Sequence, residues 1–188
     1  MTSPKPLRAD ARRNRARVLD AADALFADRG TGASTDDVAK AAGVGIGTVF
    51  RHFPTKEALL EAVYLNRLER LADEADALTG SDDPGAAFFA IFTRVVEQSA
   101  AKNALADALT SAGIDSADVA TEVREHLRTA VSTLLAQAQA AGAVRPDLDF
   151  AAVSALLVGA SRAAEHDPEA STRALAIIFD GMRARQRS

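Results

Sequence analysis

Apolar residues recur along this chain at helical spacing, and this pattern predicts the fold class. Within residues 10–29 the apolar side chains fall at i, i+1, i+4, i+7 and i+8, which places them on one face of a helix: Val18, Leu19, Ala22, Leu25 and Phe26. Similar stripes follow through the rest of the chain, and no convincing alternation of apolar and polar residues indicates a strand. The pattern therefore predicts an all-α protein.

Helix-breaking and capping residues divide this pattern into about nine helices. Gly43 and Pro54 end short segments, and the run "GSDDPG" at residues 80–85 is the clearest break in the chain. The first eight residues, which include two prolines, are expected to form a flexible arm. The expected helices span residues 10–29, 35–42, 45–53, 56–78, 84–102, 103–113, 116–142, 149–166 and 169–186.

Composition supports the helical prediction and excludes several kinds of site. Alanine, the best helix former, is abundant, and aromatic residues make up only 5 % of the chain. The absence of cysteine excludes disulfides, thiolate metal sites and cysteine nucleophiles. No apolar run approaches the roughly 18 residues of a membrane span, and the N-terminus lacks the apolar segment of a signal peptide. We therefore expect a cytoplasmic protein with no membrane partner.

Charge is distributed unevenly, although the net charge is only −4. Residues 1–56 carry ten Lys and Arg against six Asp and Glu, whereas residues 57–188 carry twelve against twenty. A basic front on an acidic body indicates that the front alone faces a polyanion. An uneven surface without any binding role is also compatible with this distribution.

The glycine-rich stretch "AGVGIGTVFRHF" at residues 42–53 raises the question of a nucleotide-binding loop. The dinucleotide fingerprint G-x-G-x-x-G fails, because Thr48 or Phe50 occupies the third glycine position, and the P-loop pattern fails as well. Both motifs also follow a buried strand, whereas the element expected before this stretch is a helix. The stretch therefore argues against such a loop.

A helix-turn-helix makes demands that the same region meets. The small Ala39 permits two helices to cross closely, and Gly43, four residues later, supplies a turn that tolerates positive φ. Val49 and Phe53 form the expected buried face of the second helix. A tight helical hairpin with another role could share this pattern. The opposite face carries groups suited to a DNA major groove, namely Thr48, Arg51 and His52.

The run "TDDVAKAAGVGIGTVFRHFPTKEALLEAV" resembles the DNA-binding domain of TetR-type (tetracycline-repressor-like) transcriptional regulators. The close resemblance covers residues 10–65, and the rest of the chain is similar only in length and helical layout. It implies an N-terminal arm and three-helix helix-turn-helix domain over residues 1–55. A long fourth helix would join it to a C-terminal ligand-binding and dimerisation domain over residues 56–188.

The resemblance also implies DNA contacts by position. Gly45 and Phe50 depart from the family, which usually has Ser or Thr and Tyr there, so the helix cap is slightly weaker and a phosphate-binding hydroxyl is missing. Ile46 can either pack inward or touch a thymine methyl group. Lys56 stands at a helix start, where anions are favoured. The implied DNA-binding residues are Thr35, Ile46, Gly47, Thr48, Phe50, Arg51, His52 and Lys56.

No arrangement of residues indicates a catalytic or metal site. His126 lies four residues after Glu122, but an exposed or half-buried helical histidine is preferred over a metal ligand. Ser161, in "GASRA", does not match the nucleophile motif G-x-S-x-G. We therefore expect neither an enzyme, nor a cofactor, nor a bound metal.

A phenylalanine cluster at residues 88–92 can belong to the core or to a ligand cavity. Core packing is the first interpretation for at least one of the three rings. In TetR-type proteins the corresponding region walls a cavity, so the resemblance implies a small-molecule effector that is apolar or amphipathic. The residues expected at this cavity are Phe88, Phe89, Phe92, Leu105, Leu109, Leu127, Val131 and Leu134.

The segment "ALAIIFDGMRA" near the C-terminus is apolar almost all round. A helix of this kind needs a second apolar partner besides its own core. The resemblance implies that this partner is another copy of the chain in a two-fold dimer. The expected interface includes Leu157, Ile177 and Ile178.

These inferences combine into a homodimeric, sequence-specific DNA-binding transcriptional regulator. It would repress from a roughly palindromic double-stranded operator until a small ligand releases it. The alternative is a helical ligand-binding or partner-docking protein whose front domain no longer binds DNA, because the usual residues are missing at Gly45 and Phe50. An enzyme ranks third.

Overall fold

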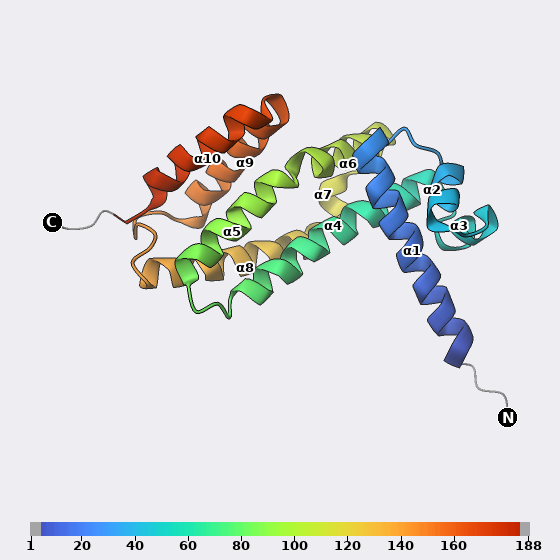
Figure 1. Ribbon diagram of the computed structural model, residues 1–188, viewed down its shortest axis with the longest axis horizontal. Coiled ribbons are helices and arrows are strands. Elements are labelled where there is room, and N and C mark those ends of the chain that lie inside the picture. Colours follow the sequence, from blue (N-terminus) through green and yellow to red (C-terminus); the bar gives the residue numbers. More distant parts are fainter. Residues whose placement is uncertain (1–4, 185–188) are drawn as a thin grey trace. The chain divides into compact units, whose positions relative to one another are not determined.

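The computed structural model describes residues 5–184, and these residues form ten helices (Figure 1). Within that range the β-type pairing is a single isolated bridge between Val144 and Arg183. The all-α prediction is confirmed. The helices are α1 (Lys5–Arg29), α2 (Thr35–Ala42), α3 (Ile46–His52), α4 (Lys56–Leu78), α5 (Pro84–Glu97), α6 (Ser99–Ser111), α7 (Ser116–Val119), α8 (Thr121–Ala140), α9 (Phe150–His166) and α10 (Pro168–Met182).

The chain divides into two compact units, and two helices contribute to both of them. Among the described residues, the first unit contains 5–66 and 103–119, and the second contains 67–102 and 120–184. Helices α4 and α6 therefore each carry the chain from one unit into the other. This compact division falls after Asn66, whereas the functional boundary predicted between residues 55 and 56 stays a prediction.

The first unit is built around the predicted apolar stripe of α1. Helix α1 packs against α2 and α3, and α2 packs against α3. The buried residues of the two short helices, α2 and α3, are all small or β-branched, so the backbones can approach closely. The buried side chains of the three helices and the residue after α3 are Val18, Leu19, Ala22, Phe26, Val38, Ala39, Ala42, Val49 and Phe53.

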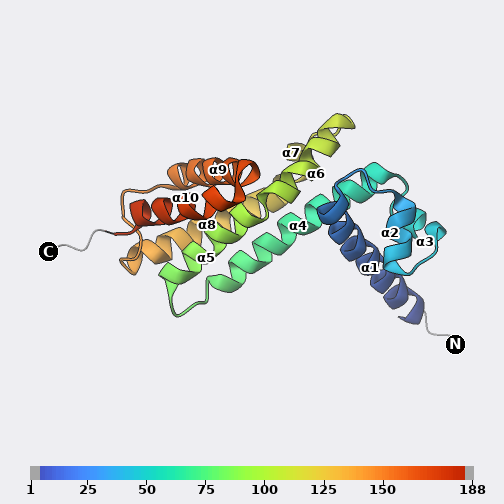
Figure 2. The same cartoon turned by 45° about the horizontal axis from the view of Figure 1, so that its top comes forward.

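The second unit has its core between α5, α8, α9 and α10. Helix α5 packs against α8 and α9, and α9 and α10 lie side by side (Figure 2). Aromatic rings of α5 meet Phe179 of α10, with centroids 4.8 Å from Phe89 and 5.5 Å from Phe92. No helix within residues 5–184 is long and apolar enough to span a membrane.

Several predicted helix limits are corrected by the structure. Helix α1 already begins at Lys5, so residues 5–8 are not part of an arm, and residues 1–4 lie outside the described range. The segment 116–142 is not one helix, because the backbone leaves helical geometry at Ala120, which is completely buried. The predicted end of the last helix, residues 185–186, also lies outside the described range.

The predicted division between residues 102 and 103 is wrong, and the break lies at Gln98 instead. The buried hydroxyl of Ser99 donates to the carbonyl oxygen of Val96 at 2.7 Å. Such a local side-chain bond competes with regular helical hydrogen bonding and favours an interruption. Neither this break nor the one at Ala120 coincides with a glycine or a proline.

Candidate functional site

Helix α2 begins with a capping box that fixes its first turn. The Ser34 hydroxyl accepts a hydrogen bond from the Asp37 backbone N–H at 3.1 Å, and the Asp37 carboxylate accepts from the Ser34 hydroxyl at 2.7 Å. The bond from the Ser34 side chain, and then that from its backbone, lowers the pKa of Asp37. Ser34 is therefore the N-cap residue of α2. Thr35 is consequently the first helical residue, and its side chain is half-buried.

Gly43 forms the turn between α2 and α3, as predicted. Its backbone has φ 63° and ψ 40°, in the left-handed region that glycine adopts at low cost, and its N–H donates to the Lys40 carbonyl oxygen at 3.2 Å. Arg17 of α1 stabilises this turn, since its Nη2 donates to the carbonyl oxygens of Ala42 at 2.6 Å and of Gly43 at 3.3 Å. Sequence reasoning missed this role of Arg17.

Helix α3 keeps one face buried and leaves the other exposed. Val49 is completely buried, and Phe53, just after the helix, is 3 % exposed. Ile46 and Phe50 are 38 % and 46 % exposed, so Ile46 does not pack inward. A Cβ atom added at Gly47 would meet no atom within 4 Å. We define the reading face as the residues of α3 that this arrangement leaves accessible: Ile46, Gly47, Thr48, Phe50, Arg51 and His52.

The cations near this face have no carboxylate partner, in contrast to others of the first unit. Within residues 5–184, neither Arg51 nor Lys56 forms an ion pair. Lys40 on α2, by comparison, lies 2.6 Å from the Asp36 carboxylate, and their hydrogen bond raises the pKa of Lys40. The positive charges of Arg51 and Lys56 are therefore not held in an ion pair within the described residues.

Lys56 is the first residue of α4, and the helix start around it is well formed. The Thr55 hydroxyl accepts from the Ala58 backbone N–H at 3.1 Å and so caps the helix. Hydrogen bonds from its own backbone N–H and from Thr55 lower the pKa of Glu57. The exposed helix start and the Lys56 ammonium together suit an anion such as a DNA phosphate.

A separate, partly open cavity of about 170 Å³ lies within the second unit. Two of the predicted ligand residues, Leu127 and Val131, line it. Leu157, predicted at the dimer interface, lines it too. Its cationic residues were missed, although Arg124 and Arg128 share the helical spacing of Leu127 and Val131. The full lining consists of Leu68, Val95, Lys102, Arg124, Leu127, Arg128, Val131, Phe150 and Leu157.

The other predicted ligand residues do not line this cavity. Phe88, Phe92 and Leu134 are buried in the core of the second unit, and Phe89 packs on the same core. Leu105 and Leu109 are also buried, but they belong to the first unit. Helical periodicity could not separate these positions from the cavity, because core and cavity residues both face inward.

The last two helices expose apolar side chains. Ile177 on α10 is 73 % exposed and Val158 on α9 is 61 % exposed. Leu157 and Ile178, by contrast, are half-buried and pack against the core of their own unit. Of the three residues predicted for a dimer interface, Ile177 is thus the one with a mostly exposed side chain. Val158 is an additional candidate that sequence reasoning missed.

His126 has a structural partner on another helix. Its Nε2 lies 2.7 Å from the Asp76 carboxylate, so this contact joins α8 to α4 inside the second unit. In the described part of the chain, no group of three or more residues of the metal-binding types is close enough to hold a metal ion.

Two family descriptions match this chain and together cover most of it. Residues 18–63 match "Bacterial regulatory proteins, tetR family", and residues 83–184 match "Transcriptional regulator SbtR-like, C-terminal domain". The first range contains the helix-turn-helix and the start of α4, and the second contains most of the cavity lining and the exposed apolar side chains of α9 and α10.

Individual proteins show the same relationship. The TetR regulatory protein of Mycobacterium vanbaalenii is 44 % identical, covers 95 % of this chain and 100 % of its own, and superimposes with a TM-score of 0.82. UidR of Escherichia coli is 28 % identical over 184 residues, or 95 % of this chain and 93 % of UidR. The repressor LfrR of Mycolicibacterium smegmatis is 40 % identical over 100 residues, or 52 % and 49 % of the two chains. This chain therefore belongs to the TetR family of helix-turn-helix transcriptional regulators.

Proposed function

We propose that this protein is a homodimeric repressor that inserts α3 into the major groove of a palindromic operator. The observation that carries the proposal is the reading face, where small and apolar side chains lie beside cations without carboxylate partners. Gly47 and Thr48 permit close approach to base edges, and Ile46 and Phe50 offer apolar contact to thymine methyl groups or sugars. Arg51, His52, Lys56 and Thr35 are the proposed phosphate and base contacts.

Repression, rather than activation, is supported by the relative LfrR, which is described as a repressor. The alternative of a front domain that no longer binds DNA loses part of its support. Although Gly45 offers no side-chain cap, α3 forms fully from Ile46 to His52 and presents its exposed face. No catalytic role is proposed.

The cavity of the second unit is the proposed effector site. Helix α4 runs without interruption from Lys56 to Leu78, so it joins the first unit to the second. A ligand that prefers one arrangement of the two units would shift the spacing of the two reading helices in the dimer. It can do so only to the extent of its differential affinity for the two arrangements.

A DNA titration tests this proposal. The purified protein is titrated against fluorescently labelled DNA from the region upstream of its own gene and against a shuffled fragment of equal length and composition, at one salt concentration. We expect at least about a 1,000-fold preference for the natural fragment, the lower end of the range usual for specific DNA binding. Equal affinity for the two fragments would contradict specific recognition at this site.

A further inference from the structure

The cavity of the second unit combines an apolar interior with a one-sided charge. Its lining contains six apolar residues and three cations, and no carboxylate belongs to it among the residues that the structure describes. Such walls of low polarity strengthen the field of the cations at the mouth. The three cations are Lys102, Arg124 and Arg128.

We propose that the effector of this regulator is an organic acid, with an aryl or short alkyl body in the cavity and its anionic group on the Lys102 ammonium. This inference rests on the proposed function in that it identifies the cavity as the effector site. It adds the charge and the size of the ligand and the residue that selects it.

Lys102 is the cation whose charge is least compensated. Its side chain is half-buried, and within residues 5–184 it forms no ion pair. Burial, and then the nearby Arg124 guanidinium, lowers the pKa of Lys102, whereas Glu165 acts in the opposite direction. That carboxylate is itself 2.9 Å from Arg162. An ammonium withdrawn from water without a partner is unfavourable, so an anion brought into the cavity is stabilised there.

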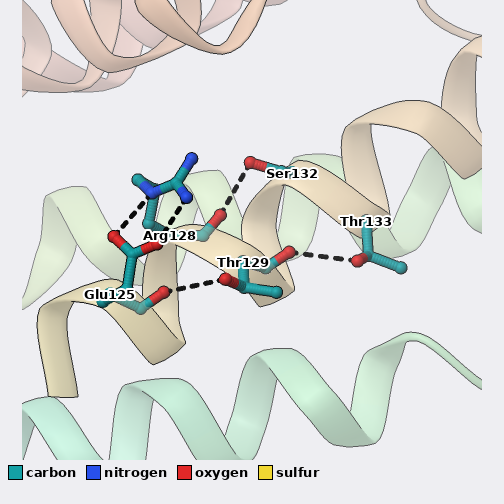
Figure 3. Close-up of polar contacts among 5 residues, drawn as sticks. All are labelled: Glu125, Arg128, Thr129, Ser132 and Thr133. Atoms are coloured by element: carbon teal, nitrogen blue, oxygen red, sulfur yellow. Dashed lines mark hydrogen bonds and ion pairs between the residues drawn. The ribbon is translucent and has the colours of Figure 1, made fainter. Parts of the chain in front are cut away.

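Arg128 is a weaker candidate, because its charge is already compensated. Figure 3 shows its guanidinium turned toward Glu125 on the same helix, and its Nε donates to the carboxylate at 2.8 Å. A second bond joins Nη2 to the other carboxylate oxygen. The hydroxyls of Thr129, Ser132 and Thr133 bond to carbonyl oxygens of their own helix (Figure 3). The polar groups of this stretch of α8 are therefore less available to bind an acid than the Lys102 ammonium is.

The volume limits the apolar body of the ligand. An apolar cavity of about 150 Å³ binds benzene, so the 170 Å³ present here suits one or two aromatic rings or a short alkyl chain. The cavity is partly open, which leaves room for an acid group at its mouth. A ligand with a positive charge is disfavoured by all three cations.

Two matched probes test the inference. 2-Naphthoate carries a carboxylate on a naphthalene ring, and 2-naphthalenemethanol carries a neutral hydroxymethyl group on the same ring. Naphthalene fluorescence reports binding cleanly, because the chain has no tryptophan. We expect the intact protein to bind the acid at least about tenfold more tightly than the alcohol. The reason is that the Coulomb attraction between opposite charges is stronger at a partly buried site than in bulk water.

The Lys102→Met variant should reduce the affinity for the acid to that for the alcohol and leave the alcohol unchanged, whereas Lys102→Arg should restore the preference. Arg173→Met removes one positive charge from an exposed site on α10 outside the cavity lining and serves as the control. Equal affinity of the intact protein for the two probes, a failure of either to bind, or an unchanged preference in Lys102→Met would each overturn the inference. DNA affinity, measured on the same samples, separates such a failure from a failure of the proposed function.

Discussion

The two units of this protein leave different groups exposed without a partner. The first unit leaves cations, because Arg51 and Lys56 beside the reading face form no ion pair within residues 5–184. The second unit leaves apolar side chains, Val158 and Ile177, which are more exposed than Ile46 and Phe50 of the first unit. Several arginines of the second unit are paired with carboxylates of the same unit: Arg94 with Glu74, Arg128 with Glu125, Arg145 with Asp147, Arg162 with Glu165 and Arg183 with Asp180.

This difference indicates two different partners for the two surfaces. Exposed ion pairs contribute little to stability, but they cancel the field that a polyanion would feel. Cations without such partners are available to phosphates, and exposed apolar side chains are available to another apolar surface. The net charge of −4 therefore does not argue against DNA binding, because what matters is the charge at the reading face.

The largest expected effect comes from a substitution among the exposed apolar side chains of the second unit. In a dimer that buries Ile177, the Ile177→Asp variant would place a charge in the interface, and we expect monomers and a loss of DNA affinity of about 100-fold or more. Sedimentation equilibrium and DNA titration measure the two effects. Ile178→Asp is less suitable, because Ile178 packs against the core of its own unit.

The control for this variant adds the same charge at a different exposed helical position. Ala136 lies on α8 with its side chain exposed, so Ala136→Asp should leave both the oligomeric state and the DNA affinity unaltered. If Ile177→Asp stays dimeric at the concentrations at which it binds DNA, α10 is not the interface.

The next largest effect is expected from removing the cations beside the reading face that form no ion pair. The Arg51→Ala/Lys56→Ala double variant should lose about tenfold to 100-fold in DNA affinity. The slope of log affinity against log salt is negative, and its magnitude should decrease by about two, one for each lost phosphate contact. Titrations at three or more salt concentrations measure both quantities. The matched double variant Arg29→Ala/Lys40→Ala removes two cations that are paired with Asp28 and Asp36. Its slope should change by much less, and equal losses in the two double variants would show that pairing is irrelevant.

A third variant changes the shape of the reading face without changing its charge. The Gly47→Leu variant adds a side chain where a Cβ meets no atom within 4 Å, and leucine favours helix over glycine by up to about 1 kcal/mol. The protein should therefore keep or raise its melting temperature, while DNA affinity falls by about tenfold because the helix can no longer approach the bases closely. Circular dichroism measures the melting temperature, and DNA titration measures the affinity. Unchanged DNA affinity would remove Gly47 from the interface.

The smallest effect concerns the support of the turn. Arg17→Ala removes the bonds to the carbonyl oxygens of Ala42 and Gly43, and we expect the free energy of unfolding to fall by about 1 kcal/mol. Arg13→Ala, which removes an exposed pair with Asp10, should cost about half of that or less. Urea denaturation measures both variants. Equal costs would mean that the bonds to the turn add nothing beyond surface charge.

The helix-turn-helix could be predicted from sequence because its signals are local. Ser34 caps α2, Gly43 ends it in the left-handed region, and Pro54 and Thr55 separate α3 from α4 within a few residues of the elements that they delimit. The contact of Arg17 with the turn could not be predicted in this way. It joins residues 25 and 26 positions apart, and no repeat pattern encodes it.

The second unit was less predictable for a similar reason. The breaks at Gln98 and Ala120 coincide with neither a glycine nor a proline, and Ser99 and Ala120 are buried in the folded unit. The cavity depends on how whole helices pack, so periodicity identified Leu127 and Val131 as inward-facing but could not distinguish them from the core residue Leu134.

Footprinting of the protein on DNA from beside its own gene tests the central claim, that a dimer reads two half-sites with α3, most directly. Hydroxyl-radical cleavage is compared for the intact protein and for the Arg51→Ala/Lys56→Ala variant at one salt concentration. We predict two protected half-sites related by a two-fold axis and spaced by one helical turn of DNA or a multiple of it, and their loss in the variant. A single asymmetric footprint, or the same footprint in the variant, would contradict the account.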